Sequence, residues 1–392
     1  MIREYVFSNS RSMKDVEIEL FDLMKLSLWS RSDSSLQQID GEEEVVAERL
    51  RNFSWRVLFR LAKEQCVIGL TADVLASCKG KIGVPKDVLL IWIGLAMKLE
   101  QHNLKMNRMV ISLYGKLRSF GWHPVLMKGQ AFAQNYPNPL HRVCGDIDLY
   151  FKQQDDCKKA IEWAIRVGGH SHHGNESAWE HKHFAVDLKG FEVELHYQMC
   201  RFENHRLQQR LQNIIDHEFA TNDPYYVRIE GEEIETVPPT LSVLHQLMHI
   251  TRHLLEAGVG IRQICDLAVY IDRHCDEINT GVLRQYVEEL QLGGVAGALG
   301  YILVEMLGLK KEKWPLGIVA DNAEFIIREI FDGGNFGRQR TAFQRNENVF
   351  VRKWHSMTYF IKRCLLFRHL LPAESRSYVL NKFLFNIHVK RD

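Results

Sequence analysis

The hydrophobic pattern of this chain changes between residues 121 and 239, and this change constrains the possible fold more than any other feature. Outside this segment apolar residues recur at helical spacing, whereas inside it short runs alternate polar and apolar residues. Two such runs flank Lys189-Gly190 and two more flank Gly231, as in β-hairpins. We therefore expect an α+β fold whose small mixed or antiparallel sheet has four to six strands, flanked by helical regions at both ends.

Helical patterns fill the rest of the sequence. Apolar residues recur at helical spacing in residues 13–29, 42–66 and 71–78. Pro85 stands where a first-turn proline belongs and opens a long helical pattern that ends near Phe120. Helical patterns return at Thr240 and continue to about residue 386. We therefore divide the chain into a helical N-terminal region (1–110), an α+β core (111–239) and a helical C-terminal domain (240–392).

Composition and charge argue against several classes of protein. The 50 Lys and Arg residues nearly balance 49 Asp and Glu residues, so no bulk charge attracts nucleic acid or an anionic membrane. Eight cysteines occur without a C-x-x-C pair, which fits reduced thiols better than a zinc ribbon or a disulfide framework. There is no secretory signal pattern, and the longest apolar run is about half of a bilayer span. We expect a soluble, cytoplasmic protein without a membrane partner; the oligomeric state stays open.

Two aspartates on a predicted strand provide the first sign of chemistry. Asp146 and Asp148 alternate with apolar residues, so both side chains project from one face of the strand. Two carboxylates this close repel each other unless a cation lies between them, and oxygen ligands suit Mg²⁺ or Mn²⁺ rather than zinc. With Lys128 and Gly129 upstream, the pattern suggests a nucleoside triphosphate site. A solvated sheet face is the alternative interpretation of the aspartate pair.

A later strand supplies the third carboxylate that such a site requires. Strict alternation in FEVELHY places Glu192, Glu194 and His196 on one face. If this strand lies beside the aspartate strand, the two faces form a three-carboxylate cluster. Phosphoryl transfer with two metal ions uses such a cluster to activate the attacking oxygen and to hold the triphosphate.

These segments resemble a known family. LMKGQAFAQNY and HRVCGDIDLYF, followed by FEVELHYQM, look like the putative bacterial nucleotidyltransferase family within the DNA polymerase β-like superfamily. The helical segment after residue 240 is similar to the same family, so the resemblance covers roughly residues 120–275. It implies that Asp146, Asp148 and Glu194 bind the metal. His196 joins them in the predicted catalytic group, with three roles open: orienting a carboxylate, acting as general base, or a structural role.

The resemblance also implies a set of nucleotide-binding residues. Gly129 is expected at the phosphate turn, and Lys128 and Arg142 are expected to neutralise phosphate charge. A surface position for the lysine and an ion pair for the arginine are the alternatives. Gln130 departs from the family pattern, which usually has Ser or Gly after the turn glycine. Gln130 is nevertheless predicted to belong to the nucleotide-binding group, but the pattern does not predict which phosphate atoms it contacts.

Other polar groups have more than one interpretation. A histidine-rich segment could capture a transition metal, form a polar loop, or act as a lid; its histidines are His170, His172, His173, His181 and His183. His249 and His253 lie one helical turn apart, as do Arg262 and Asp266, which we expect to form an i,i+4 pair that supports the cleft. The glycine-rich stretch at 331–340 is more typical of a loop between helices than of a phosphate site.

Together these features predict a metal-dependent nucleotidyltransferase. Its cofactor would be Mg²⁺ or Mn²⁺, and its substrate a nucleoside triphosphate such as ATP. The acceptor could be a small molecule, a protein or an RNA end, because all of them present similar nucleophiles. A catalytically silent nucleotide-binding or interaction protein on the same scaffold is the alternative. RNA modification is a third possibility, since arginines at 338, 340, 345 and 352 could form a local basic strip.

Overall fold

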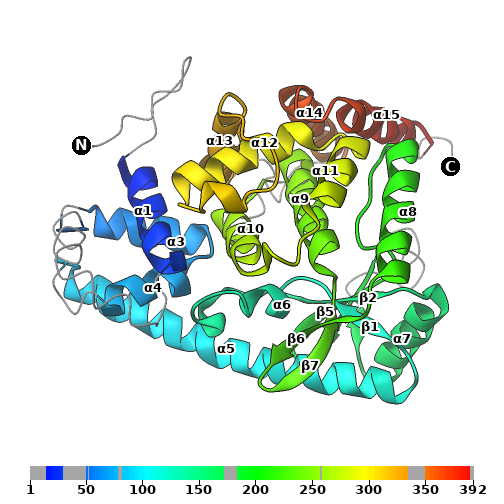
Figure 1. Cartoon of the computed structure of the whole chain (residues 1–392), viewed down its shortest axis with the longest axis horizontal. Coiled ribbons are helices and arrows are strands. Elements are labelled where there is room, and N and C mark those ends of the chain that lie inside the picture. The colour runs from blue at the N-terminus through cyan, green and yellow to red at the C-terminus, as the bar shows by residue number, and fades with distance from the viewer. Residues whose placement is uncertain are drawn as a thin grey trace.

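The computed structural model describes residues 15–29, 50–51, 53–77, 82–171, 183–256, 258–333 and 349–388. It combines one sheet with helices before and after it in the sequence, which confirms the predicted α+β class. Helix α5 (Lys86–Ser119) runs along the bottom of the molecule in Figure 1, from the N-terminal helices to the sheet. The C-terminal helices lie above it in this view.

In the described part of the chain the sheet has seven strands, in the order β3-β4-β5-β2-β1-β7-β6. The pairs β2–β5 and β1–β7 are parallel and the other neighbours are antiparallel, so the sheet is mixed, as the sequence predicts. It exceeds the expected number of strands because the short edge strand β3 has no clear alternating pattern. The strands are β1 (Pro124–Leu126), β2 (Ile147–Phe151), β3 (His170–Ser171), β4 (His183–Leu188), β5 (Phe191–His196), β6 (Tyr225–Ile229) and β7 (Glu232–Thr236).

Two tight turns set the register of the two predicted hairpins. Between β4 and β5, Lys189 and Gly190 have φ angles of 56° and 83°. Between β6 and β7, Glu230 and Gly231 have φ angles of 49° and 92°. Two consecutive residues with positive φ form the turn whose twist matches that of the strands it joins. Both turns lie where the sequence predicts them, and the first one determines which residues of β4 face those of β5.

The N-terminal helices confirm the predicted helical character of the described part of this region. Trp55 and Trp92 are buried and pack edge to face. Helix α5 begins directly after Pro85 and continues without a break through positions 110 and 111, where the sequence analysis places a domain boundary. The helices are α1 (Asp15–Trp29), α3 (Trp55–Glu64), α4 (Ile68–Ser77) and α5.

The remaining helices surround the sheet and form the C-terminal part. The side chain of Asn204 caps α8 by accepting hydrogen bonds from two backbone N–H groups of its first turn. Between β1 and β7 lie α6 (Gln130–Ala133), η2 (Pro139–His141), α7 (Gln154–Arg166) and α8 (His205–Thr221). After them follow α9 (Pro239–Glu256), α10 (Ile261–His274), α11 (Thr280–Glu289), α12 (Gly293–Tyr301), η3 (Ile302–Met306), η4 (Lys311–Lys313), α13 (Ala323–Gly333), α14 (Val349–Phe367) and α15 (Pro372–His388). Residues 331–333 of the predicted glycine-rich loop form the end of α13, and its remaining residues lie outside the described part of the chain.

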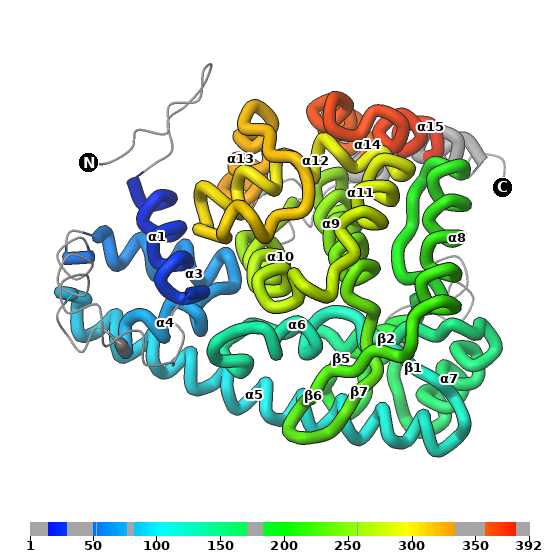
Figure 2. Tube along the Cα trace, in the orientation of Figure 1, coloured from blue at the N-terminus to red at the C-terminus, as the bar shows by residue number. Residues whose placement is uncertain are grey.

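Two hydrophobic clusters form the core, and α5 contributes to both. Its first half places Val88 and Trp92 in the larger cluster, which joins the N-terminal helices to the C-terminal ones. Its second half places Val110 and Leu117 in a smaller cluster beneath the sheet. Figure 2 shows α5 extending from the N-terminal helices to the strands as one uninterrupted helix. The position of the sheet relative to the helical parts therefore depends on this helix.

Candidate active site

Three carboxylates meet where two parallel strands lie side by side. In the register of β2 and β5, Asp148 pairs with Glu194. Asp146 precedes Asp148 by two residues and projects from the same face. One carboxylate oxygen from each of Asp146, Asp148 and Glu194 lies within 4.8 Å of the others. The structure therefore brings together the three residues that the sequence analysis predicts as metal ligands.

Lys128 and His196 contact the central carboxylate of this group. Oδ1 of Asp148 lies 3.0 Å from Nζ of Lys128 and 2.9 Å from Nε2 of His196. The same Nε2 atom lies 3.0 Å from Oε2 of Glu194. Burial alone would raise the pKa of Asp148, but Lys128 and His196 outweigh it and hold the pKa well below its ordinary value. His196 is fully buried, and its Nε2 atom contacts both carboxylates.

The carboxylate cluster has two unfavourable features that a bound cation would remove: repulsion between its charges and a buried oxygen without a hydrogen-bond donor among the described residues. The charge of Asp148 raises the pKa of Asp146 to about 6, and burial adds to this effect. Oδ2 of Asp148 is buried without a hydrogen-bond partner among the described residues. A buried carboxylate oxygen normally has a donor or a metal ion beside it. Because all three donors are carboxylates, this donor set fits Mg²⁺ or Mn²⁺.

Gly129 forms the turn that follows β1. It adopts φ 55° and ψ −112°, a conformation that residues with a Cβ atom rarely adopt. A Cβ atom there would also lie 3.3 Å from the carbonyl oxygen of Asp146. The turn therefore lies directly against the aspartate strand, and Gly129 lines the cleft above it. Gln130 is only 1% exposed and contacts Met106 of α5, so its side chain lies in the core beneath the turn.

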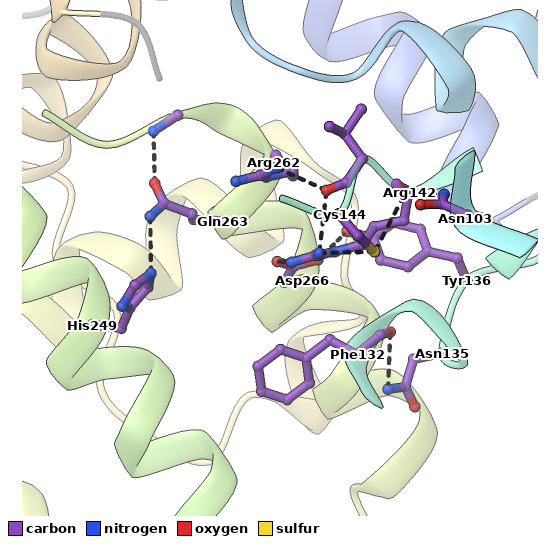
Figure 3. Close-up of polar contacts among 12 residues, drawn as sticks. Asn103, Phe132, Asn135, Tyr136, Arg142, Cys144, His249, Arg262, Gln263 and Asp266 are labelled. Carbon is purple, nitrogen blue, oxygen red and sulfur yellow. Dashed lines mark hydrogen bonds and ion pairs between the residues drawn. The ribbon is translucent and has the colours of Figure 1, made fainter. Parts of the chain in front are cut away.

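Arg142 forms an ion pair, which is the alternative to its predicted phosphate contact. Its Nε and Nη2 atoms lie 3.0 and 2.6 Å from the two carboxylate oxygens of Asp266 in α10. Tyr136 donates a third hydrogen bond to this carboxylate, over 2.8 Å (Figure 3). The sequence analysis pairs Asp266 with Arg262, but Arg262 donates to the carbonyl oxygen of Val143 over 2.7 Å. The loop before β2 packs on α10, and this long-range contact takes precedence over helical spacing.

Helices α9 and α10 form the wall opposite the carboxylates. Both amide atoms of Gln246 are buried without a hydrogen-bond partner among the described residues. Gln263 accepts a hydrogen bond from the backbone N–H of Gly260 and points its Nε2 at Nε2 of His249, 3.2 Å away (Figure 3). Because a backbone N–H can only donate, this arrangement makes Nε2 of His249 the acceptor. The wall consists of Gln246, His249, Ile250, His253, Arg262, Gln263 and Asp266.

The sequence groups His183 with the histidine-rich segment as a possible metal ligand or lid residue, but it does not connect this residue with Glu194 or His196. In the β4–β5 hairpin His183 pairs with His196, and its Nε2 lies 3.3 Å from Oε1 of Glu194. Counting outward from the Lys189-Gly190 turn would have found this pairing. Glu192, two residues before Glu194, is exposed. His170, in the histidine-rich segment, is also exposed. His172, His173 and His181 lie outside the described residues. Gln246 has no sequence signal, because a glutamine on a helix face gives no hint of the cleft.

Comparison with protein families identifies a family to which the chain is similar. The model of a family described as uncharacterised nucleotidyltransferases matches residues 51–308. The chain belongs to this family. The matched part of the chain includes the carboxylate strands and the α9–α10 wall, and it begins well before the segment that carries the resemblance in the sequence. Comparison with curated proteins and with solved structures finds no significant match. Among the described residues, no helix combines the length and apolar character needed to cross a membrane.

Proposed function

We propose that this protein is a metal-dependent nucleotidyltransferase. It would move a nucleoside monophosphate from a triphosphate such as ATP to an acceptor hydroxyl or phosphate, with release of pyrophosphate. The observation that carries this proposal is the meeting of Asp146, Asp148 and Glu194 where two parallel strands lie side by side. One oxygen of Asp148 is buried there without a donor among the described residues. Membership of the nucleotidyltransferase family supports it.

In this proposal the three carboxylates hold Mg²⁺ or Mn²⁺. A bound ion supplies charge neutralisation on the triphosphate. His196 keeps Asp148 and Glu194 oriented through the two contacts of its Nε2 atom. These residues therefore position the reacting groups and provide the electrostatic environment, which is the main source of catalysis in phosphoryl transfer.

Lys128 is the cation that we place beside the phosphates. Burial opposes its charge, but Asp148, Asp146 and Glu194 outweigh burial and raise the pKa of Lys128. The lysine therefore stays protonated, and the backbone of Gly129 lies next to it at the cleft surface. The guanidinium of Arg142 is hydrogen-bonded to Asp266. We therefore propose that Arg142 positions the loop that leads into Asp146.

The α9–α10 wall faces the carboxylate cluster across the cleft. We propose that it receives the nucleobase or the acceptor, since both need polar groups that read their edges. The amide of Gln246 offers an NH₂ group as donor and a carbonyl oxygen as acceptor. Phe132 and Ile250 add apolar surface to the same cleft. A small molecule, a protein side chain and an RNA end all remain candidate acceptors, provided that their nucleophile reaches the α-phosphorus beside the carboxylates.

The experiment is a transfer assay with the full-length protein, Mg²⁺, each of the labelled nucleoside triphosphates and a panel of acceptors. Pyrophosphate release and label transfer are both measured. The double variant Asp146→Asn, Asp148→Asn should lose both signals. Glu192→Gln is the matched control, because Glu192 lies on the same strand as Glu194 but is exposed.

Two results would argue against the proposal. Full transfer by the double variant would show that these aspartates do not hold the metal. Calorimetric binding of a triphosphate without metal and without pyrophosphate release, across the whole panel, would instead favour a catalytically silent nucleotide-binding protein.

A further inference from the structure

A second group of possible metal ligands shares one residue with the carboxylate cluster. One ring nitrogen of His183, one oxygen of Glu194 and one ring nitrogen of His196 lie close enough to bind one ion, since all three atoms are within 4.8 Å of one another. The three residues come from the two strands of one hairpin, because His183 pairs directly with His196. The two imidazole rings are tilted by 40°, with centroids 4.9 Å apart.

The distances in this group match those of a zinc site. Zinc binds nitrogen and oxygen ligands at about 2.0–2.1 Å in a tetrahedron, so its ligand atoms stand about 3.3 Å apart. Nε2 of His183 lies 3.3 Å from Oε1 of Glu194, and Nε2 of His196 lies 3.0 Å from Oε2 of the same residue. Oδ1 of Asp148, 2.9 Å from Nε2 of His196, could serve as a fourth ligand. An ion could therefore enter with only small shifts of these side chains.

The chemistry of the donors separates this group from the carboxylate cluster. Imidazole nitrogen favours zinc and other late first-row ions, whereas Mg²⁺ prefers oxygen ligands only. Two histidines with one glutamate form a ligand set that zinc proteins use. The Asp146, Asp148 and Glu194 cluster, by contrast, has no nitrogen ligand. The two groups therefore differ in the ion that each of them prefers.

We propose that His183, Glu194 and His196 form a binding site for Zn²⁺ that excludes the oxygen-bound cation. Both ligand sets use the carboxylate of Glu194, and the fourth zinc ligand, Asp148, also belongs to the oxygen-only cluster, so the two ions compete for the same oxygens. Zinc binding would therefore inhibit the transfer reaction, and this consequence rests on the proposed function. The binding itself does not rest on it.

Zinc binding also requires a movement of protons. Nε2 of His196 faces two carboxylate oxygens and Nε2 of His183 faces one, and each such contact needs a proton on the nitrogen. A zinc ion replaces that proton, which moves to Nδ1 of a neutral ring or leaves an imidazolium for solvent. The number of protons released on binding can be measured by calorimetry in buffers of different ionisation enthalpy.

The test uses Co²⁺ as a spectroscopic probe and Zn²⁺ as a competitor, with the full-length protein and no nucleotide. Co²⁺ bound by two nitrogens in a near-tetrahedral site gives visible absorption, which Zn²⁺ should abolish stoichiometrically. Because both ligand sets use Glu194, Mg²⁺ should reduce this absorption only at large excess. His183→Ala should weaken Co²⁺ and Zn²⁺ binding by roughly 100-fold or more, since loss of even an indirect partner costs about 10–100-fold.

Two controls isolate the hairpin histidines. His170→Ala removes an exposed histidine near the same segment and should leave the Co²⁺ spectrum unchanged. The triple variant His172→Ala, His173→Ala, His181→Ala removes the remaining histidines of the segment and should also keep the spectrum. Loss of the spectrum in the triple variant with its retention in His183→Ala would overturn the proposal. Absence of any Co²⁺ absorption would do the same.

The outcome is distinguishable from failure of the proposed function. Zn²⁺ binding that depends on His183, in a protein without transferase activity, would support the zinc site and refute the transferase. Mg²⁺-dependent transfer that Zn²⁺ inhibits equally in wild type and His183→Ala would support the transferase and refute this zinc site.

Discussion

Arg142 and Asp266 form a buried ion pair that joins the loop before β2 to helix α10. Two hydrogen bonds of 3.0 and 2.6 Å link them, and both side chains are only 6% exposed. Arg142 is four residues before Asp146, so the position of the carboxylate cluster relative to the α9–α10 wall depends on this pair. The two halves of the cleft are therefore connected by an electrostatic contact between residues far apart in sequence.

Asp266→Ala should destabilise the protein strongly. The variant leaves the guanidinium of Arg142 buried without its counter-charge, and breaking a buried pair in this way costs about 3–5 kcal/mol. Chemical denaturation gives the free energy of unfolding. The double variant Arg142→Met, Asp266→Leu removes both charges and should recover most of the lost stability. A double variant that is less stable than Asp266→Ala would contradict this account.

Asp146→Asn should stabilise the metal-free protein while it abolishes transfer. Asp148 raises the pKa of Asp146 to about 6, so at neutral pH the ionised carboxylate is held against repulsion. Removing that charge should increase the free energy of unfolding by about 1–2 kcal/mol in chelator at pH 7. Glu192→Gln, on an exposed position, should change neither quantity. Equal or lower stability of Asp146→Asn would show that the repulsion is already relieved.

Gln246→Leu should preserve or increase stability but weaken substrate binding. The side chain is 4% exposed, and its amide has no partner among the described residues. Each buried polar group without a partner costs about 1–3 kcal/mol, which an apolar side chain of similar shape avoids. We expect a gain of about 1 kcal/mol or more in thermal denaturation, and a rise of about tenfold in KM for the triphosphate or the acceptor. Unchanged KM for both substrates would remove Gln246 from the site.

The stability of the protein should fall as pH rises through the pKa of His141. Nδ1 of this histidine lies 2.5 Å from Asp73 of α4, and its Nε2 lies 2.8 Å from Glu100 of α5. Burial opposes the charge, but the two carboxylates outweigh burial and raise the pKa above 6.5. A raised folded-state pKa gives stabilisation that is complete below the unfolded-state value and lost above the folded-state value.

The measurement is a series of melting temperatures from about pH 6 to about pH 9 for wild type and His141→Ala. The variant should lose about 1–3 kcal/mol at the acidic end, where both charge-assisted hydrogen bonds exist in the wild type. The difference between the two proteins should shrink toward the alkaline end. A constant difference across the range would mean that His141 acts by packing alone.

Local patterns in the sequence predicted the sheet strands that carry the carboxylates. Alternation placed Asp146, Asp148 and Glu194 on strand faces, and the Lys189-Gly190 turn located the hairpin. The structure adds the parallel register that pairs Asp148 with Glu194. Register between strands far apart in sequence depends on packing of the whole sheet, so alternation alone could suggest this pairing but not determine it.

Contacts between distant parts of the chain could not be predicted in the same way. Arg142 and Asp266 are 124 residues apart, and nothing local distinguishes this pair from the i,i+4 pair expected within α10. The family resemblance places Gln130 beside the phosphate turn, but its side chain packs into the core against α5. The difference arises because each of these side chains follows the packing of helices onto the sheet, which the sequence encodes only through the complete fold.

The continuity of helix α5 limits where the chain can be cut, and which parts of it recombination can exchange separately. Its 34 residues span about 51 Å, and residues from its two halves belong to different hydrophobic clusters. A fragment that starts at residue 111 would lose Met106 and Val110 from beneath the sheet. We expect such a fragment to aggregate, whereas one that starts ahead of Pro85 keeps the helix whole. Recombination between related genes would therefore exchange the sheet together with this helix, and the N-terminal helices packed on α5 would be exchanged with the strands that carry the carboxylates.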